Sequence, residues 1–270
     1  MLKKYFFILI LSSPLMAGEI TLRYKPETGK IVNYNACLNI RQNLKELNRQ
    51  TPPSGVPVFA DIEIKAVFSL EISTAKRGYK ETYTLNSITA SLSADGYSEN
   101  YKNLAEEYKG QSWSVFLSSR GEILSDKSGF ISYASPAIYG RKLSPGREFK
   151  TESKVSYPIL GMLINVSTNN VYKLKKITAA GLCFFDFRTY VETSSHYPVR
   201  KKFMADGDIT GTGRGSFTYN SRRGIIEEAA AEFSLASEIL SQADGKKQLL
   251  KLIQSIEIEI VSGIGDGALQ

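Results

Sequence analysis

Three glycines at alternate positions are the part of this sequence that most resembles a ligand-binding motif. Gly211, Gly213 and Gly215 have the close spacing of a phosphate-binding loop. Such a loop also needs a strand before the glycines and a helix after them. Here the residues that follow, Ser216 to Tyr219, alternate between hydroxyl and aromatic side chains, which is typical of a strand. We therefore expect the glycines to lie within a strand, where they allow a bend, close backbone packing or a large side chain from a neighbouring strand.

Two sets of carboxylates have the residue types of a catalytic pair. Paired Asp and Glu side chains hydrolyse glycosides when they lie about 5 to 10 Å apart in a cleft. The sets comprise Asp61, Glu63 and Glu71 in one segment and Glu227, Glu228 and Glu232 in another. Both segments alternate with apolar residues, so we interpret the carboxylates as the solvated faces of half-buried strands. An enzyme built on them is a weaker alternative.

The sole histidine, His196, lies in a Ser-Ser-His-Tyr-Pro segment that we predict as a loop. No Gly-x-Ser-x-Gly elbow surrounds any serine, which disfavours a Ser-His-Asp triad. A metal site is also disfavoured, because no Cys-x-x-Cys pair accompanies the single imidazole. The sequence therefore predicts no catalytic, cofactor-binding or metal-binding residue, and no cofactor.

Two cysteines, Cys37 and Cys183, lie far apart in the sequence. In an oxidising compartment they could form one disulfide across a long loop, which would stabilise the fold by roughly 4 to 5 kcal/mol in the chain-entropy model. The alternative is that both are buried as small hydrophobic residues. Cys37 falls on the more polar face of its predicted strand, which weakens that alternative slightly.

Alternation of apolar and polar residues dominates the chain. Between Val58 and Ser73, eight apolar residues occupy successive alternate positions. This predicts an antiparallel strand far longer than the usual five or six residues, which must curve or bulge around a core. The apolar positions change parity between Leu85 and Ile88, which predicts a bulge or a break at Asn86-Ser87. Residues 220–224 read as the turn of a hairpin near the end of the chain.

Helical patterns are few: residues 99–108 form one candidate, and residues 237–254 could begin as a second. Residues 51–57 read as a loop, and residues 134–146, rich in proline, glycine and serine, as an internal boundary. The predicted fold class is therefore mainly β: an antiparallel, curved sheet, half-barrel or sandwich with one or two minor helices. We expect a single β-rich domain over residues 19–270, with two halves joined near 134–146.

The first 18 residues have the order of a secretory signal peptide. Lys3 and Lys4 precede an apolar stretch, Tyr5 to Leu11, and small residues follow at Ala17 and Gly18. That stretch is shorter than the roughly 18 to 20 residues that cross a bilayer, and no later segment supplies such a run. We expect a periplasmic or extracellular protein with no transmembrane helix after signal removal.

The formal net charge of +7 includes the two lysines of this signal. The remaining basic residues form no dense block, so they favour solvated strand faces, with anionic envelope surfaces as the alternative. Nucleic-acid binding is disfavoured, since it needs a focused basic stripe with interleaved aromatic residues.

Several turns and strand segments resemble a family of exported bacterial proteins that carry a domain of unassigned function. These segments are residues 22–35, 118–124, 143–149, 171–177 and 211–226. The resemblance implies an exported antiparallel β protein and implies no particular chemistry. At the level of fold, long curved strands on an exported chain are also similar to the lipoprotein-carrier superfamily, whose half-barrels hold acyl chains.

Two functional hypotheses follow for an exported, non-enzymatic protein. In the first, it is periplasmic or envelope-associated and binds a lipophilic ligand or envelope component, with a cavity lined by Tyr34, Phe68, Phe185 and Phe187. In the second, it is a structural or interaction protein with a solid core and no ligand. The sequence leaves the oligomeric state open.

Overall fold

A computed structural model describes residues 19–46, 59–94, 97–100, 108–126, 138–159, 162–199, 203–243 and 246–263. All the secondary-structure elements of this part of the chain are strands, and all their pairings are antiparallel. The predicted mainly β, antiparallel class is confirmed. No helix in these ranges is long and apolar enough to cross a membrane.

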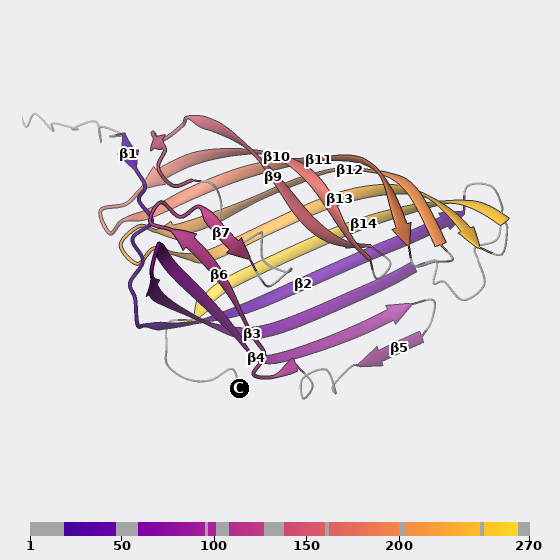
Figure 1. Ribbon diagram of the computed structural model, residues 1–270, viewed down its shortest axis with the longest axis horizontal. Helices are drawn as coiled ribbons and strands as arrows, with labels where there is room; N and C mark the ends of the chain where they lie inside the picture. Colours follow the sequence, from indigo (N-terminus) through magenta and orange to yellow (C-terminus); the bar gives the residue numbers. More distant parts are fainter. Residues whose placement is uncertain are drawn as a thin grey trace, which may run out of the picture.

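Two meanders make up one large sheet (Figure 1). The first contains β2 (Ile31–Glu46), β3 (Phe59–Ala75), β4 (Gly78–Ala94), β6 (Ser112–Ser118) and β7 (Ile123–Asp126), with β5 (Tyr97–Asn100) paired to β4. The second contains β9 (Glu148–Ile159), β10 (Met162–Ile177), β11 (Leu182–Val199), β12 (Phe203–Asn220), β13 (Ile225–Ala243) and β14 (Lys246–Gly263). Pairing of β14 with β2 joins the meanders, so that β7 and β9 lie at the two ends of the strand order.

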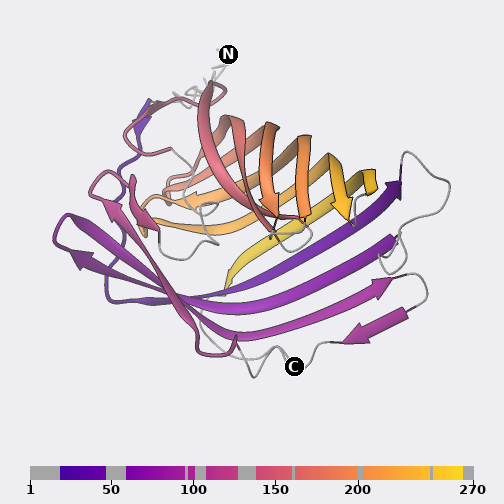
Figure 2. The ribbon, with the colours of Figure 1, turned by 45° about the vertical axis from the view of Figure 1, so that its right-hand side comes forward.

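The sheet is curved and unclosed, as Figure 2 shows. The predicted boundary at 134–146 falls where the chain passes from β7 to β9, and residues 134–137 lie outside the described ranges. Within this connection, β8 (Lys142–Leu143) pairs with β1 (Ile20–Thr21) as a separate two-stranded sheet. The connection therefore returns to the N-terminal segment before the second meander begins.

The bulge predicted in the first meander is confirmed. Val67 pairs with Ser87 and Phe68 pairs with Leu85, which leaves Asn86 as the extra residue of β4. The bulge restores the apolar parity, so that Leu85 and Ile88 both face the same side of the sheet. The hairpin predicted around 220–224 is also confirmed, as the connection between β12 and β13.

The predicted helix over 237–254 is wrong, because residues 237–243 continue β13 and residues 246–254 form the first half of β14. Leu249, Leu250 and Ile253 suggested a helical cluster, but cross-strand pairing with β13 and β2 dominates. The helix predicted over 99–108 is contradicted at its start, where Glu99 and Asn100 pair with β4, whereas Tyr108 at its end is helical. Residues 101–107, and the loop predicted at 51–57, lie outside the described ranges.

Packed aromatic and aliphatic side chains fill one end of the sheet, which we call the aromatic end. One cluster there includes Tyr24, Tyr34 and Tyr83, and a second includes Phe185 and Tyr219. The Tyr139 ring packs against both clusters. Since strands of both meanders meet Tyr139 with the same face, that face is the inside of the curve, and we call it the inner face.

Candidate functional site

The inner face of the central strands carries a continuous apolar surface. The register places Ala231, Ile258, Leu38, Ile64 and Ala90 in one row across β13, β14, β2, β3 and β4. The next row towards the aromatic end is also apolar. Side chains of this region that are apolar and only half-buried form what we call the inner band: Ala36, Leu38, Ile40, Ile62, Ile64, Ala66, Ile88, Ala90, Leu92, Ala229, Ala231, Ile258 and Ile260.

The inner band lies between two better-covered regions of the same face. Towards the aromatic end, Leu70 and Ile72 are buried, and towards the other end Leu44 and Leu252 are buried. Between these regions the side chains of the band stay partly open to solvent. An apolar surface of this kind, partly open to solvent and bounded by packed ends, is typical of a site for an apolar ligand.

The four residues predicted to line a cavity all lie on the inner face, at or beside the aromatic end. Tyr34 stacks on Phe68 with ring centroids 5.1 Å apart, and its hydroxyl donates a hydrogen bond to the Ile226 carbonyl oxygen. Phe185 and Phe187 both contact Phe217, with centroid separations of 4.8 and 6.4 Å. The structure thus brings the four together as two pairs in two clusters. Tyr34 and Phe185 are core residues, and the half-buried band lies further along the strands.

A buried carboxyl group at the aromatic end was not predicted. Glu81 is 8% exposed, and it accepts hydrogen bonds from the hydroxyls of Tyr24 and Tyr83, the latter at 2.7 Å. Burial raises the pKa of Glu81 above its ordinary value, and the two tyrosine hydrogen bonds oppose this by lowering it. The available signal was parity, since Glu81 shares the apolar face of β4 with Tyr79 and Tyr83.

A second polar group on the inner face lies towards the edge strand β9. The Asn170 amide nitrogen donates to the hydroxyls of Ser153 and Thr168, at 3.0 and 3.2 Å, and its oxygen accepts from Thr189 at 2.8 Å. Ser153 and Thr168 also share a hydrogen bond of 2.7 Å. These side chains satisfy one another, so they need no further partner.

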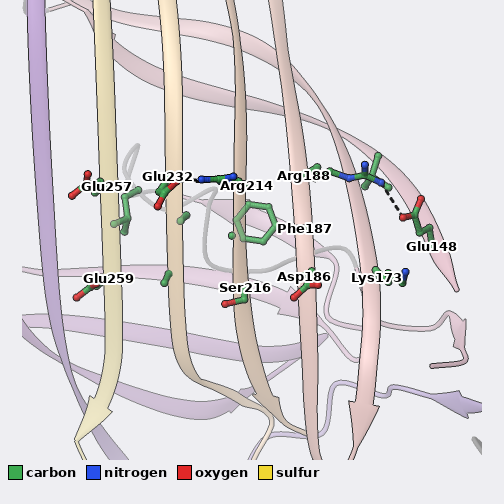
Figure 3. Close-up of a pocket in the computed structure, with 15 residues that line it drawn as sticks. Glu148, Lys173, Asp186, Phe187, Arg188, Arg214, Ser216, Glu232, Glu257 and Glu259 are labelled. Carbon is green, nitrogen blue, oxygen red and sulfur yellow. Dashed lines mark hydrogen bonds and ion pairs between the residues drawn. The ribbon is translucent and has the colours of Figure 1, made fainter. Parts of the chain in front are cut away.

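The outer face carries a charged groove of about 710 Å³ across β9 to β14 (Figure 3). Most of its basic side chains are already paired. Arg188 contacts Glu148 at 2.9 Å, and Arg214 contacts Glu232 at 2.9 Å. Glu232 also stands directly opposite Glu257 in the strand register. Exposed pairs of this kind contribute little and are typical of a solvated strand face.

The carboxylates considered for catalysis do not converge. Asp61 contacts Arg41 at 3.5 Å, and Glu63 contacts Lys65 at 2.9 Å, on the outer face of the first meander. Glu227 accepts hydrogen bonds from Asn220, Arg223 and Ser262 in the hairpin region. The third residue of the first set, Glu71, is exposed. Each described carboxylate of these sets is therefore accounted for by strand position, and most by an ion pair or a hydrogen bond.

The glycine motif lies within β12, as expected. A Cβ atom on Gly213 would overlap the Phe233 ring, and one on Gly211 would overlap Leu235. A Cβ atom on Gly215 would lie 2.7 Å from a ring carbon of Phe187. The prediction that these glycines accommodate large side chains from neighbouring strands is confirmed.

The disulfide considered between Cys37 and Cys183 is not formed, and both thiols are free. Strands β14, β13 and β12 lie between β2 and β11. The two cysteine-bearing strands are therefore four strand spacings apart, which is about 19 Å along the sheet at ~4.8 Å per spacing. Bridged cysteines need Cα atoms within about 7 Å. Cys37 also faces outward beside Lys65, whereas Cys183 is fully buried in the core, where burial raises its thiol pKa to about 11.

The segment around His196, predicted as a loop, is part of β11 and pairs with β12. The polar run from Thr193 to His196 carries no alternation, but backbone pairing with β12 extends through it, and the single proline is accommodated near the strand end. Among the described residues, no three His, Cys, Asp or Glu side chains are grouped as metal ligands would be.

Comparison with family models and with curated proteins gives no match. Among solved structures, the chain is similar to the crystal structure of the β domain of the Bordetella autotransporter Brka. The TM-score is 0.24 and the sequence identity is 8%, over 84% of this chain and 98% of that chain. At this TM-score the likeness carries no conclusion about function, which therefore depends on the geometry of the inner face.

Proposed function

We propose that this protein is an exported, non-enzymatic carrier that holds a lipophilic ligand against the inner band. The observation that carries the proposal is that the band is a continuous apolar surface whose side chains are only half-buried. Exposed apolar surface of this extent is unfavourable in water. A ligand with an acyl or other hydrocarbon chain would cover it, with a gain of roughly 0.8 kcal/mol for each methylene buried.

The N-terminal pattern supports the exported part of the proposal. Residues 1–18 have the charged, apolar and small-residue order of a signal peptide, so we infer a periplasmic or extracellular location. A carrier in such a compartment moves or stores molecules that water dissolves poorly. The outer-face carboxylates Asp61, Glu63 and Glu232 each have a basic partner, which supports a non-enzymatic role.

A structural or interaction protein without a ligand is the second candidate. The packed aromatic end favours it, because Tyr34 and Phe185 fill space there instead of opening a cavity. The two candidates differ over the inner band. A carrier binds apolar molecules there, whereas a structural protein does not.

Binding of the apolar fluorophore N-phenyl-1-naphthylamine to variants of adjacent strand positions distinguishes the candidates. Ile64→Glu places a charge in the band, and Lys65→Glu places the same charge on the outer face of the same strand. We expect the first to lower affinity at least about tenfold, because a carboxylate in an apolar site is costly, and the second to leave it unchanged.

A second pair of variants tests the band without introducing a buried charge that could unfold the protein. Ala90→Trp fills the band with an apolar ring, and Thr89→Trp places the same ring on the exposed face of β4. We expect the first variant to reduce the number of fluorophore molecules bound while its circular dichroism spectrum stays that of the wild type. Equal binding by both tryptophan variants, or no binding by the wild type, would contradict the carrier proposal.

A further inference from the structure

Two buried oxygen atoms beside the inner band have no hydrogen-bond partner. Ser237 on β13 is 1% exposed and Gln254 on β14 is 5% exposed. Among the described residues, the Ser237 hydroxyl oxygen and the Gln254 side-chain oxygen make no hydrogen bond. A buried polar group left unpaired costs about 1–3 kcal/mol, so an unpaired pair requires an explanation.

The register places these two side chains next to each other on the inner face. Ser237 pairs with Leu252 and Leu235 pairs with Gln254, so Ser237 and Gln254 are diagonal neighbours. Diagonal neighbours in an antiparallel pair are about 7–8 Å apart at Cα, within reach of one small group placed between them. The pair borders the inner band, because Gln42, the half-buried cross-strand partner of Gln254, is one inner-face step from the band residue Ile40.

The polar group around Asn170 shows what a self-sufficient arrangement looks like at the same level of the sheet. There, every side-chain oxygen and nitrogen of the asparagine is used by a hydroxyl neighbour. Ser237 has no such neighbour, since Leu252 and Ile209 are the inner-face residues opposite it, and the Gln254 oxygen makes no hydrogen bond to Gln42, the polar residue opposite it on β2. The missing partner must therefore come from outside these strands.

The chemistry of the pair specifies that partner. The Gln254 oxygen only accepts a hydrogen bond, and the Ser237 hydroxyl can donate one. A single hydroxyl group satisfies both, because it donates to the glutamine and accepts from the serine. No Lys, Arg, Asp or Glu lies on the inner face of β13 between 229 and 237, of β14 between 252 and 260, or of β2 between 32 and 44. The site therefore favours an uncharged group.

We propose that Ser237 and Gln254 bind the free hydroxyl of a neutral lipid whose chains lie on the inner band. This inference rests on the proposed carrier function and names its ligand class: an uncharged lipid with a hydroxyl, of the diacylglycerol type. The apolar rows hold the chains, and the unpaired oxygens hold the head.

The test compares three soluble probes that differ only at the head: 1,2-dioctanoylglycerol, its 3-acetyl ester, and the corresponding phosphatidate. Affinities are measured by displacement of N-phenyl-1-naphthylamine. We expect the wild type to bind the free alcohol about tenfold more tightly than the ester, which cannot donate, and more tightly than the charged phosphatidate. Equal affinity for alcohol and ester, or tighter binding of phosphatidate, would overturn the inference.

Variants assign the preference to the two residues. Ser237→Ala and Gln254→Leu should each abolish the preference for the alcohol over the ester and leave fluorophore binding unchanged. Ser234→Ala and Ser255→Ala, at exposed positions of the same strands, are the matched controls. Without ligand, Gln254→Leu should unfold at an equal or higher urea concentration, because it removes an unpaired buried acceptor.

Retention of the alcohol preference in both variants would overturn the inference while leaving the carrier function intact. A wild type that binds the fluorophore and none of the lipids would do the same. Only a wild type that binds neither the fluorophore nor any lipid would overturn the carrier function as well.

Discussion

Replacement of the buried carboxyl group at the aromatic end should change how stability depends on pH. Glu81 is buried, and burial raises its pKa above the ordinary value of 4.5. The folded protein therefore holds this proton more tightly than the unfolded chain does. The resulting stability is present in full below the unfolded pKa and is lost as pH rises through the folded pKa. Each unit of pKa difference corresponds to about 1.36 kcal/mol.

Two substitutions separate charge from hydrogen bonding at this position. Glu81→Gln keeps the size of the side chain and has no charge to desolvate; its amide oxygen accepts from one of the Tyr24 and Tyr83 hydroxyls, and its NH2 group donates to the oxygen of the other. Glu81→Leu leaves both hydroxyls without an acceptor, at about 1–3 kcal/mol each. We therefore expect the leucine variant to be about 2–6 kcal/mol less stable than the glutamine variant at any pH between 5 and 8.

Urea unfolding followed by tryptophan fluorescence is a suitable assay, because the sole tryptophan, Trp113, stacks on Tyr83 with centroids 5.8 Å apart. The free energy of unfolding of Glu81→Gln is subtracted from that of the wild type, which removes the contributions of the other titrating groups. This difference should fall as pH rises from 5 to 8. A difference that is constant or that rises with pH would refute the assignment of Glu81 as a carboxyl group with a raised pKa.

Three further predictions follow from packing, thiol exposure and export. Gly213→Val should lower the free energy of unfolding by about 1–3 kcal/mol, because the new side chain overlaps the Phe233 ring, whereas Thr212→Val on the exposed face should change it little; urea unfolding measures both. In the native protein, Ellman's reagent should label the half-buried Cys37 and should label Cys183 only after urea is added. If neither thiol is labelled in urea, the two cysteines form the disulfide that the fold disfavours. The intact mass of the protein from its native envelope should correspond to a chain that lacks about the first 17 or 18 residues, and the mass of the full chain would contradict export.

The local features of the fold follow from alternation of residue types. The parity change between Leu85 and Ile88 located the bulge at Asn86 because a bulge is a local event in one strand. The connection from β7 to β9 and the pairing of β14 with β2 depend on contacts between distant segments. No local pattern encodes those contacts, so the sequence predicted a curved sheet without its strand order.

The helix predicted over 237–254 was wrong because it relied on a short cluster of apolar residues within a longer alternation of apolar and polar residues. Leu249 and Leu250 suggested a helix, although the alternation of Ile256, Ile258 and Ile260 extends back to Leu252 in the same strand. That extension also places Gln254 on the apolar face, which was the available signal for the candidate hydroxyl site. The four residues considered as a cavity lining share the inner face, but these aromatic side chains pack against one another.

Native mass spectrometry of the wild-type protein isolated from its own envelope fraction tests the central claim most directly. The carrier account predicts the mature chain with a non-covalent adduct that dissociates on activation and is identified as a neutral, hydroxyl-bearing lipid. A mature chain that carries no adduct, together with no binding of N-phenyl-1-naphthylamine, would contradict the account and favour a structural protein with a filled interior.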